Sequence, residues 1–425
     1  MNFVGTLGFS IVLPFLVFLV DRWGGNALVY GVLGATYSAF QLIGAPILGR
    51  WSDVRGRQRI LLLSQLGTLA SWGIFLAAFA LPVRELLHLQ DSFLGTFTLT
   101  LPLLVVFVAR ALDGLTGGNI SVAHAYLADI SSDADRNVNF GKMAISANLG
   151  FILGPAIAGL LGSTAWGELL PVLLALVISL VASGLIAWRL PESRPCPQVA
   201  DDTPPGIHRI LGQEYKQCVE VAAVRRPGFL QILRLPRVGL LLAIYFLVML
   251  AFNFFYVAFP VHAVQGLQWS VRQTGAFFAI LSLLMVIVQG PVLRRALQVY
   301  SDRVLVMVGS VLLAASFPFL MLSELLGIYL GVALLALGNG LLWPSVVAIL
   351  AKVAGHDNQG AVQGVAGSFG AIASMVGMIV GGVLFDSVGV RVFLLPAAIL
   401  LVVFVLSLRM SQWHVPSTVS GSSPS

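Results

Sequence analysis

The sequence predicts an all-α integral membrane protein whose twelve transmembrane helices form two pseudo-symmetric six-helix bundles. Composition gives the first evidence: of 425 residues, 10% are charged and 58% are hydrophobic, and the mean hydropathy is +0.94. Soluble domains carry about a quarter charged residues, so this chain has too few charges to build a water-facing surface. The lipid bilayer is therefore its expected main partner.

Apolar runs of bilayer length give the second observation, since a membrane-crossing helix needs roughly 20 apolar residues. Twelve runs qualify: residues 2–20, 28–48, 60–81, 101–128, 141–162, 169–189, 238–262, 273–293, 304–323, 326–351, 362–385 and 390–409. A polar segment separates the sixth run from the seventh. We predict an N-terminal bundle at 1–190, a cytoplasmic linker at 191–237, a C-terminal bundle at 238–410 and a disordered cytoplasmic tail at 411–425.

The loop at 49–59 (GRWSDVRGRQR) fixes the predicted orientation. Four arginines surround one carboxylate between two apolar runs, and short Lys/Arg-rich loops are retained in the cytoplasm. This assignment places both termini in the cytoplasm. Four of the 24 Lys and Arg residues then fall on the opposite side, Arg110 falls inside a span, and the remainder fall on the side of this loop. The charge bias supports the orientation and argues against a nucleic-acid-binding face.

The two halves echo each other weakly. Pro46 before the basic loop has a counterpart in Pro291, and Pro14 in the first span has one in Pro260. Parallel repeats of this kind place a substrate site midway between two bundles in transporters.

A polar stripe runs along the fourth span. At 100° per residue, Arg110, Asp113, Gly117, Ser121 and His124 fall within about 80° of one another on a helix. Charged groups are costly in a bilayer, so this stripe is expected to face the bundle interior or a water-filled cavity. Arg110 and Asp113 would lie roughly 14 to 18 Å from the outer end, close to the midplane.

Two readings of this stripe stay open. In the functional one, Asp113 is a proton-coupling carboxylate that releases Arg110 when protonated, and His124 relays the proton. In the structural one, Arg110 and Asp113 form a permanent i,i+3 pair and His124 is only hydrogen-bonded.

Three motifs carry a resemblance to a known family. The loop from Gly49 to Arg59 resembles the signature loop G-xxx-D-xx-GR of the major facilitator superfamily, and Arg110-xxx-Gly114 resembles a second family motif. The span-five sequence Gly150-xxx-Gly154-Pro155-xxx-Gly159 resembles the motif of the proton-driven drug exporters, a branch that includes the tetracycline/proton antiporters. LGFSIVLP at 7–14 and LPES at 190–193 also fit that branch.

The resemblance implies roles for three sets of residues in alternating access. It implies a conformational latch between the two halves, formed by Gly49, Asp53, Arg55, Gly56, Arg57, Arg59 and Asp129. It implies an antiporter motif that seals the halves against leak, formed by Gly150, Gly154, Pro155 and Gly159. It also implies a substrate cavity between the bundles, for which our candidates are Gln41, Ser121, Asn148, Asn253, Tyr256, Asn339 and Trp343. The alternatives are a loop that only orients the protein, glycine-mediated packing and aromatic packing, respectively.

One position departs from the family pattern. Antiporters of this branch often carry an acidic residue early in span one, where this chain has Gly5. Asp113 is then the one carboxylate expected in mid-membrane, so proton coupling would depend on Asp113 or on groups at the boundary.

The functional prediction is a proton-coupled exporter of small amphiphilic compounds, with protons and a small-molecule substrate as partners. The alternative is an uncoupled facilitator or importer of a small metabolite such as a sugar or organic anion. We expect a monomer in a bacterial inner membrane. We expect no enzymatic activity, cofactor or metal, because the sequence has no paired His cluster, nucleophile elbow or metal spacing.

Overall fold

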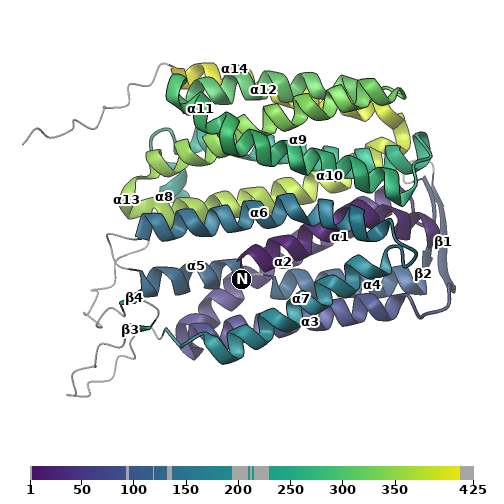
Figure 1. Ribbon diagram of the computed structural model, residues 1–425, viewed down its shortest axis with the longest axis horizontal. Coiled ribbons are helices and arrows are strands. Elements are labelled where there is room, and N and C mark those ends of the chain that lie inside the picture. The colour runs from purple at the N-terminus through teal and green to yellow at the C-terminus, as the bar shows by residue number, and fades with distance from the viewer. Residues whose placement is uncertain are drawn as a thin grey trace, which may run out of the picture.

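The computed structural model describes residues 2–91, 95–117, 119–131, 136–193, 209–210, 213–214 and 229–411. Most of the predicted linker and the tail beyond residue 411 lie outside these ranges. The described part consists mainly of long helices that run roughly parallel to one another (Figure 1).

Seven helices form the N-terminal half. They are α1 (Asn2–Arg22), α2 (Ala27–Arg55), α3 (Arg57–Ala78), α4 (Leu101–Thr116), α5 (Asn119–Ile130), α6 (Arg136–Gly162) and α7 (Leu169–Arg189). Helices α4 and α5 together make up the predicted fourth span, as one segment from Leu101 to Leu127. Helix α1 is bent by 43° between the segments Phe3–Val12 and Phe15–Arg22, and Pro14 lies in the break.

Two strands of two residues each, β3 (Arg209–Ile210) and β4 (Gln213–Glu214), precede the C-terminal half in the chain. Its elements are α8 (Phe229–Leu233), α9 (Val238–Val261), η1 (His262–Gly266), α10 (Val271–Ile287), η2 (Val288–Val292), α11 (Leu293–Val299), α12 (Asp302–Phe319), α13 (Leu325–Val388), η3 (Gly389–Phe393) and α14 (Leu394–Ser411).

The helices account for the twelve predicted spans. Among the described residues, nine helices are long and apolar enough to cross a membrane, or ten with the bent α1. One of these runs, Val362–Met410, has 49 residues. At 1.5 Å per residue it would measure about 74 Å, far more than a bilayer core, and the backbone of Gly389 (φ 59°) divides it into two crossings. Helix α6 supplies the remaining span.

Helix α13 likewise contains two spans, although its helical assignment is continuous over 64 residues. The ring of Tyr245 on α9 lies 4.9 Å from that of Trp343, and a Cβ added at Gly370 would lie 3.3 Å from the same tyrosine. Residues 27 apart in a straight helix would be about 40 Å apart, so α13 folds back on itself. The predicted tenth and eleventh spans are its two arms.

A β-hairpin covers one end of the N-terminal half, at the right of Figure 1. It joins β1 (Glu85–Asp91) to β2 (Gly95–Thr100) between α3 and α4. The amide of Thr98 donates to the carbonyl of Gly24 at 2.8 Å, and the Thr100 hydroxyl donates to that of Trp23 at 2.9 Å. We name this the hairpin end and the opposite end, where α2 meets α3, the basic-turn end. The sequence did not predict the hairpin.

Two helix pairs make the most extensive contacts between the halves, and each has a close backbone approach toward the hairpin end. Helix α2 packs on the second arm of α13, where Gly31 faces the carbonyl of Met378 so closely that a Cβ would overlap it. Helix α6 packs on α10, where Gly159 and Gly275 face each other so closely that a Cβ on either one would overlap the backbone of the other. Small residues allow this backbone approach in membrane helices, where dispersion contacts drive packing.

Glycines also set the spacing between α2 and α4 inside the N-terminal half. A Cβ at Gly44 would overlap the carbonyl of Leu115 and lie 3.0 Å from its Cα. By contrast, Gly73 on α3 has no such neighbour within 4 Å.

We therefore predict that Gly44→Ala lowers the melting temperature of the detergent-solubilised protein, because overpacking costs about 1–3 kcal/mol. Gly73→Ala is the matched control and should leave the melting temperature unchanged or raise it, since alanine is a better helix former by about 1 kcal/mol. Equal melting temperatures for the two variants would contradict the close α2–α4 packing.

Candidate functional site

The ionic pair of α4 lies inside the N-terminal half. Arg110 Nη1 lies 3.2 Å from Asp113 Oδ2, and the two residues are 1% and 6% exposed. The guanidinium carbon of Arg110 lies 4.7 Å from the centre of the Tyr37 ring on α2, a cation–π distance. The polar stripe is therefore enclosed by protein at these two positions, as the cost of exposing charge to hydrocarbon requires.

The local sequence explains how α4 positions Arg110 and Asp113 inside the N-terminal half. Pro102 stands at the start of the helix, where its missing amide hydrogen costs nothing. Gly114 faces the carbonyl of Tyr37 so closely that any side chain would overlap it. The glycine of the Arg110-xxx-Gly114 motif thus holds α2 against α4 and places the Tyr37 ring over the arginine.

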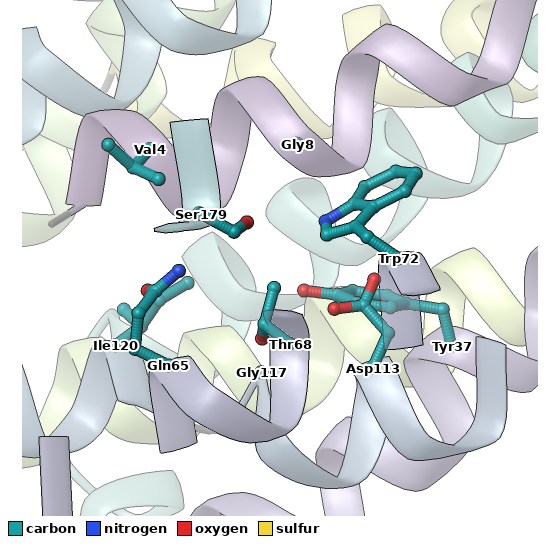
Figure 2. A pocket seen from close by; sticks show the side chains of 11 residues that line it. Val4, Gly8, Tyr37, Gln65, Thr68, Trp72, Asp113, Gly117, Ile120 and Ser179 are labelled. Atoms are coloured by element: carbon teal, nitrogen blue, oxygen red, sulfur yellow. The ribbon is translucent and has the colours of Figure 1, made fainter. Parts of the chain in front are cut away.

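A small cavity with several polar groups in its wall lies beside Asp113 (Figure 2). Its volume is about 20 Å³, enough for one water molecule, which needs roughly 10–15 Å³. Six helices contribute to its wall, which consists of Val4, Gly5, Gly8, Tyr37, Gln65, Thr68, Trp72, Asp113, Gly117, Ile120 and Ser179. Asp113 is the one carboxylate in this wall. Sequence reasoning missed the contribution of α3 and α7, because it considered each span separately.

The other members of the stripe are placed differently. The Ser121 hydroxyl donates to the carbonyl of Ala45 at 3.3 Å, and His124 is half-buried on α5. Helices α4 and α5 together form one membrane-length segment, Leu101–Leu127, so these residues belong to the same span as Arg110 and Asp113. Within the described ranges, no group of three or more His, Cys, Asp or Glu residues is placed to hold a metal ion.

The candidate cavity residues are distributed over both halves. The Gln41 amide lies between α2 and α4, donating to the carbonyl of Gly117 at 3.2 Å. The Asn253 amide donates to the carbonyl of Met249 at 2.8 Å, and its Cβ faces Gly377 of α13. These bonds tie both amides to helix packing, and the side chain of Asn148 lies outside the described part.

The remaining candidates belong to the C-terminal half. Tyr256 is buried among aromatic rings, with the ring of Phe252 at 4.9 Å, and its carbonyl accepts a hydrogen bond from the Tyr30 hydroxyl at 3.1 Å. Asn339 is buried on α13, and Trp343 is half-buried against Tyr245. The structure does not test their predicted contact with substrate.

The basic turn is a network within the N-terminal half. Arg57 is buried, and its side chain lies 3.0 Å from the Asp129 carboxylate and 2.6 Å from the Ser52 hydroxyl. Gly56 has a φ of 98°, a conformation that favours glycine. The backbone N–H of Gln58 donates to the carboxylate of Glu192 at 3.1 Å. The pairing of Asp129 agrees with the sequence, whereas the role of Glu192 in LPES was missed.

The other residues of the turn take less part in that network. Arg55 and Arg59 are exposed, and Arg55 lies 5.2 Å from the Trp51 ring centre. A Cβ at Gly49 would lie 3.9 Å from the Ser121 hydroxyl, and the side chain of Asp53 lies outside the described part. The contacts found here join elements of one half, so the latch between halves stays a prediction.

The span-five motif serves two contacts. The Ser10 hydroxyl on α1 donates to the carbonyl of Gly150 at 3.0 Å, and Gly154 lies against the same serine. Pro155 lies within α6, one turn before Gly159, which meets Gly275 of the other half. The first two glycines therefore pack α6 on α1, and the third joins the halves.

A carboxylate at the hairpin end completes the contact between halves. Asp386, near the end of α13, accepts a hydrogen bond from the Leu28 amide at 3.1 Å. This amide belongs to the first turn of α2, where backbone N–H groups lack helical partners and a negative charge is stabilising. Sequence reasoning passed over Asp386 because its partner is a backbone group from a residue 358 positions away.

Comparisons with known proteins agree with this architecture. The family model described as Major Facilitator Superfamily matches residues 1–322 and 241–423. Tetracycline resistance protein, class E, from Escherichia coli is 25% identical over 390 residues, covering 91% of this chain and 86% of its own length. Solute carrier family 67 member A1 from Homo sapiens is 27% identical over 391 residues, covering 91% and 83%.

A solved structure supports the fold. The crystal structure of the human organic anion transporter MFSD10 (TETRAN) superposes with a TM-score of 0.65 at 20% identity and covers 96% of each chain. Its arrangement agrees with the twelve spans in two six-helix bundles derived above. The chain is a multi-pass membrane protein of the Major Facilitator Superfamily, whose members are transporters and not enzymes.

Proposed function

We propose that this protein is a secondary active transporter that exports small amphiphilic compounds in exchange for protons, with Asp113 as the coupling carboxylate. The observation that carries the proposal is the buried pair of Arg110 and Asp113, which lies beside a cavity of water size in the N-terminal half. Protonation of Asp113 would remove its attraction for Arg110 and free the guanidinium for a new partner. The names of the tetracycline resistance relatives favour the same class of substrate.

The contacts at the hairpin end favour alternating access between the two halves. The contacts Gly159–Gly275, Gly31–Met378 and Leu28–Asp386 all lie toward that end. With the basic turn in the cytoplasm, they would seal the outer side, and the structure would correspond to an outward-closed state. We place both termini in the cytoplasm and the protein, as a monomer, in a bacterial inner membrane.

A second candidate is an uncoupled facilitator of an organic anion. The buried cation Arg110 favours it, since arginine is well suited to binding carboxylates, and a relative of known structure is titled an organic anion transporter. The two candidates differ in whether substrate movement is accompanied by proton movement.

The first prediction concerns proton coupling. Everted membrane vesicles are acidified inside by respiration, and both tetracycline uptake and the proton release that accompanies it are followed. We expect Asp113→Asn to lower gradient-driven uptake at least about tenfold, equivalent to about 1.4 kcal/mol, because the amide cannot take up a proton. Asp302→Asn is the matched control. Asp302 and Lys352 form an ion pair within the C-terminal half, away from Asp113, and the Asp302→Asn variant should transport normally.

Three results would contradict the proposal. One is an unchanged gradient-driven uptake in Asp113→Asn. Another is tetracycline counterflow without proton movement, which would favour the facilitator. The third is the absence of any tetracycline transport by the intact protein, which would remove the inference drawn from the relatives.

The second prediction concerns the seal. With Cys196 and Cys218 replaced by serine, Ala27→Cys reports access to the buried contact between α2 and α13. We expect Gly159→Leu to separate α6 from α10 at a cost of about 1–3 kcal/mol. The labelling of that cysteine in intact cells by a membrane-impermeant maleimide should rise about 5- to 150-fold.

Gly184→Leu is the control for the seal, because Gly184 has open space around it. Equal labelling in the two variants would contradict the sealing role of Gly159. Labelling confined to everted vesicles would contradict the proposed orientation.

A further inference from the structure

Two buried hydrogen-bond donors face the cavity beside Asp113. Gln65 is 1% exposed and Trp72 is 2% exposed, and both line the cavity. The Gln65 amide nitrogen and the Trp72 indole nitrogen have no hydrogen-bond partner in the structure. Figure 2 shows these two nitrogens and the Asp113 carboxylate directed into the same space. Buried polar groups are almost always satisfied, so this space requires an occupant.

The chemistry of the wall identifies the occupant. Two N–H donors require an acceptor and would repel a metal cation, while the Asp113 carboxylate would repel an anion. A water molecule can accept from either nitrogen and donate to the carboxylate. A volume of about 20 Å³ is sufficient for one water and too small for a larger ligand.

The sequence explains why a space exists there. Gln65, Thr68 and Trp72 are spaced i, i+3 and i+7, so they lie on one face of α3. Across from them, α1 contributes Gly5 and Gly8, and a Cβ at Gly8 would lie 3.6 Å from the Trp72 ring. The missing side chains of these glycines leave the volume that the cavity occupies.

We propose that this cavity is a water-binding site through which protons reach Asp113 from within the N-terminal half, separately from the path of the substrate between the halves. This proposal rests on the function proposed above. A hydronium ion formed on the bound water transfers one proton to an Asp113 oxygen: its O–H bond breaks, the carboxyl O–H bond forms, and a water molecule remains. The reverse step releases the proton.

Helix α1 runs from Asn2 toward the hairpin, and Val4 and Gly5 place part of the wall in its first turn. The ionisable groups that face Asp113 are Arg110 from α4 and Tyr37 from α2, with Tyr30 beyond Arg110. The described wall residues from α1, α3, α5 and α7 carry no ionisable side chain.

Hydroxyl-radical footprinting of the intact protein tests for the water without any substrate. Radicals generated from bound water oxidise neighbouring side chains, and tryptophan reacts fast. Trp23 is the internal control, because it is also buried, 5% exposed, and packs on Phe79 away from the cavity. We expect Trp72, although more buried, to be oxidised at least as fast as Trp23. Slower oxidation of Trp72 would overturn the water site.

A cavity-filling variant sharpens this comparison. Ser179→Leu places a larger apolar side chain in the wall, and we expect slower oxidation of Trp72 with no change at Trp23. An unchanged rate at Trp72 in a variant that melts normally would contradict the site. If the variant does not fold, the comparison of Trp72 with Trp23 in the unmodified protein still decides whether the water site exists.

Transport assays then test the proton route. In the tetracycline vesicle assay, we expect the double variant Gln65→Leu/Trp72→Phe to lose gradient-driven uptake at least about tenfold while keeping counterflow, and Trp23→Phe to behave as wild type. Unchanged uptake would overturn the route and leave the proposed function standing. A parallel loss of counterflow would show damage to the transport path and also contradict the assignment. Absence of gradient-driven uptake in the wild type would instead refute the proposed function, while footprinting would still report on the water.

Discussion

The fold depends on one constraint, namely that a charge in the membrane must be enclosed by groups that replace water. An isolated arginine or aspartate at the centre of a membrane helix costs about 2.5–3.5 kcal/mol even on the lower scales. Arg110 and Asp113 reduce this cost by pairing, with the Tyr37 ring over the guanidinium and a cavity of water size at the carboxylate. Removing one member of a buried pair typically costs about 3–5 kcal/mol, so a protonation event at Asp113 is coupled to the packing around it.

Glycines set the close contacts both within the N-terminal half and between the two halves. Within the N-terminal half, Gly44 and Gly114 hold α2 against α4 and so keep Tyr37 over the ion pair. Between the halves, Gly31 and Gly159 bring backbones together at the hairpin end with few side chains interposed. Contacts of this kind are short-range and lost together, which suits an interface that has two discrete arrangements. Helix α2 takes part in both sets, so it connects the ion pair to the contact between the halves.

Sequence reasoning predicted the twelve spans, the two-bundle fold and the burial of Arg110 and Asp113, because bilayer length and the cost of charge in lipid are local properties. It missed the β-hairpin, the carboxylates Glu192 and Asp386, and the cavity wall from α3 and α7. These features depend on contacts between distant segments, and two of them involve backbone amides that carry no sequence signal. Gly5 is a further example. From the sequence, Gly5 is only a position where related antiporters often carry an acidic residue, whereas the structure places Gly5 and Asp113 in the wall of one cavity.

The central claim is that Asp113 changes its protonation state while remaining buried next to Arg110. Infrared difference spectroscopy of the membrane-embedded protein during a pH jump measures this most directly, because a protonated buried carboxyl group has a carbonyl band of its own. The account predicts such a band in the wild type that appears as the pH falls and is absent from Asp113→Asn. A wild-type spectrum without that band, over the whole pH range in which the protein stays folded, would show a permanent ion pair and contradict the account.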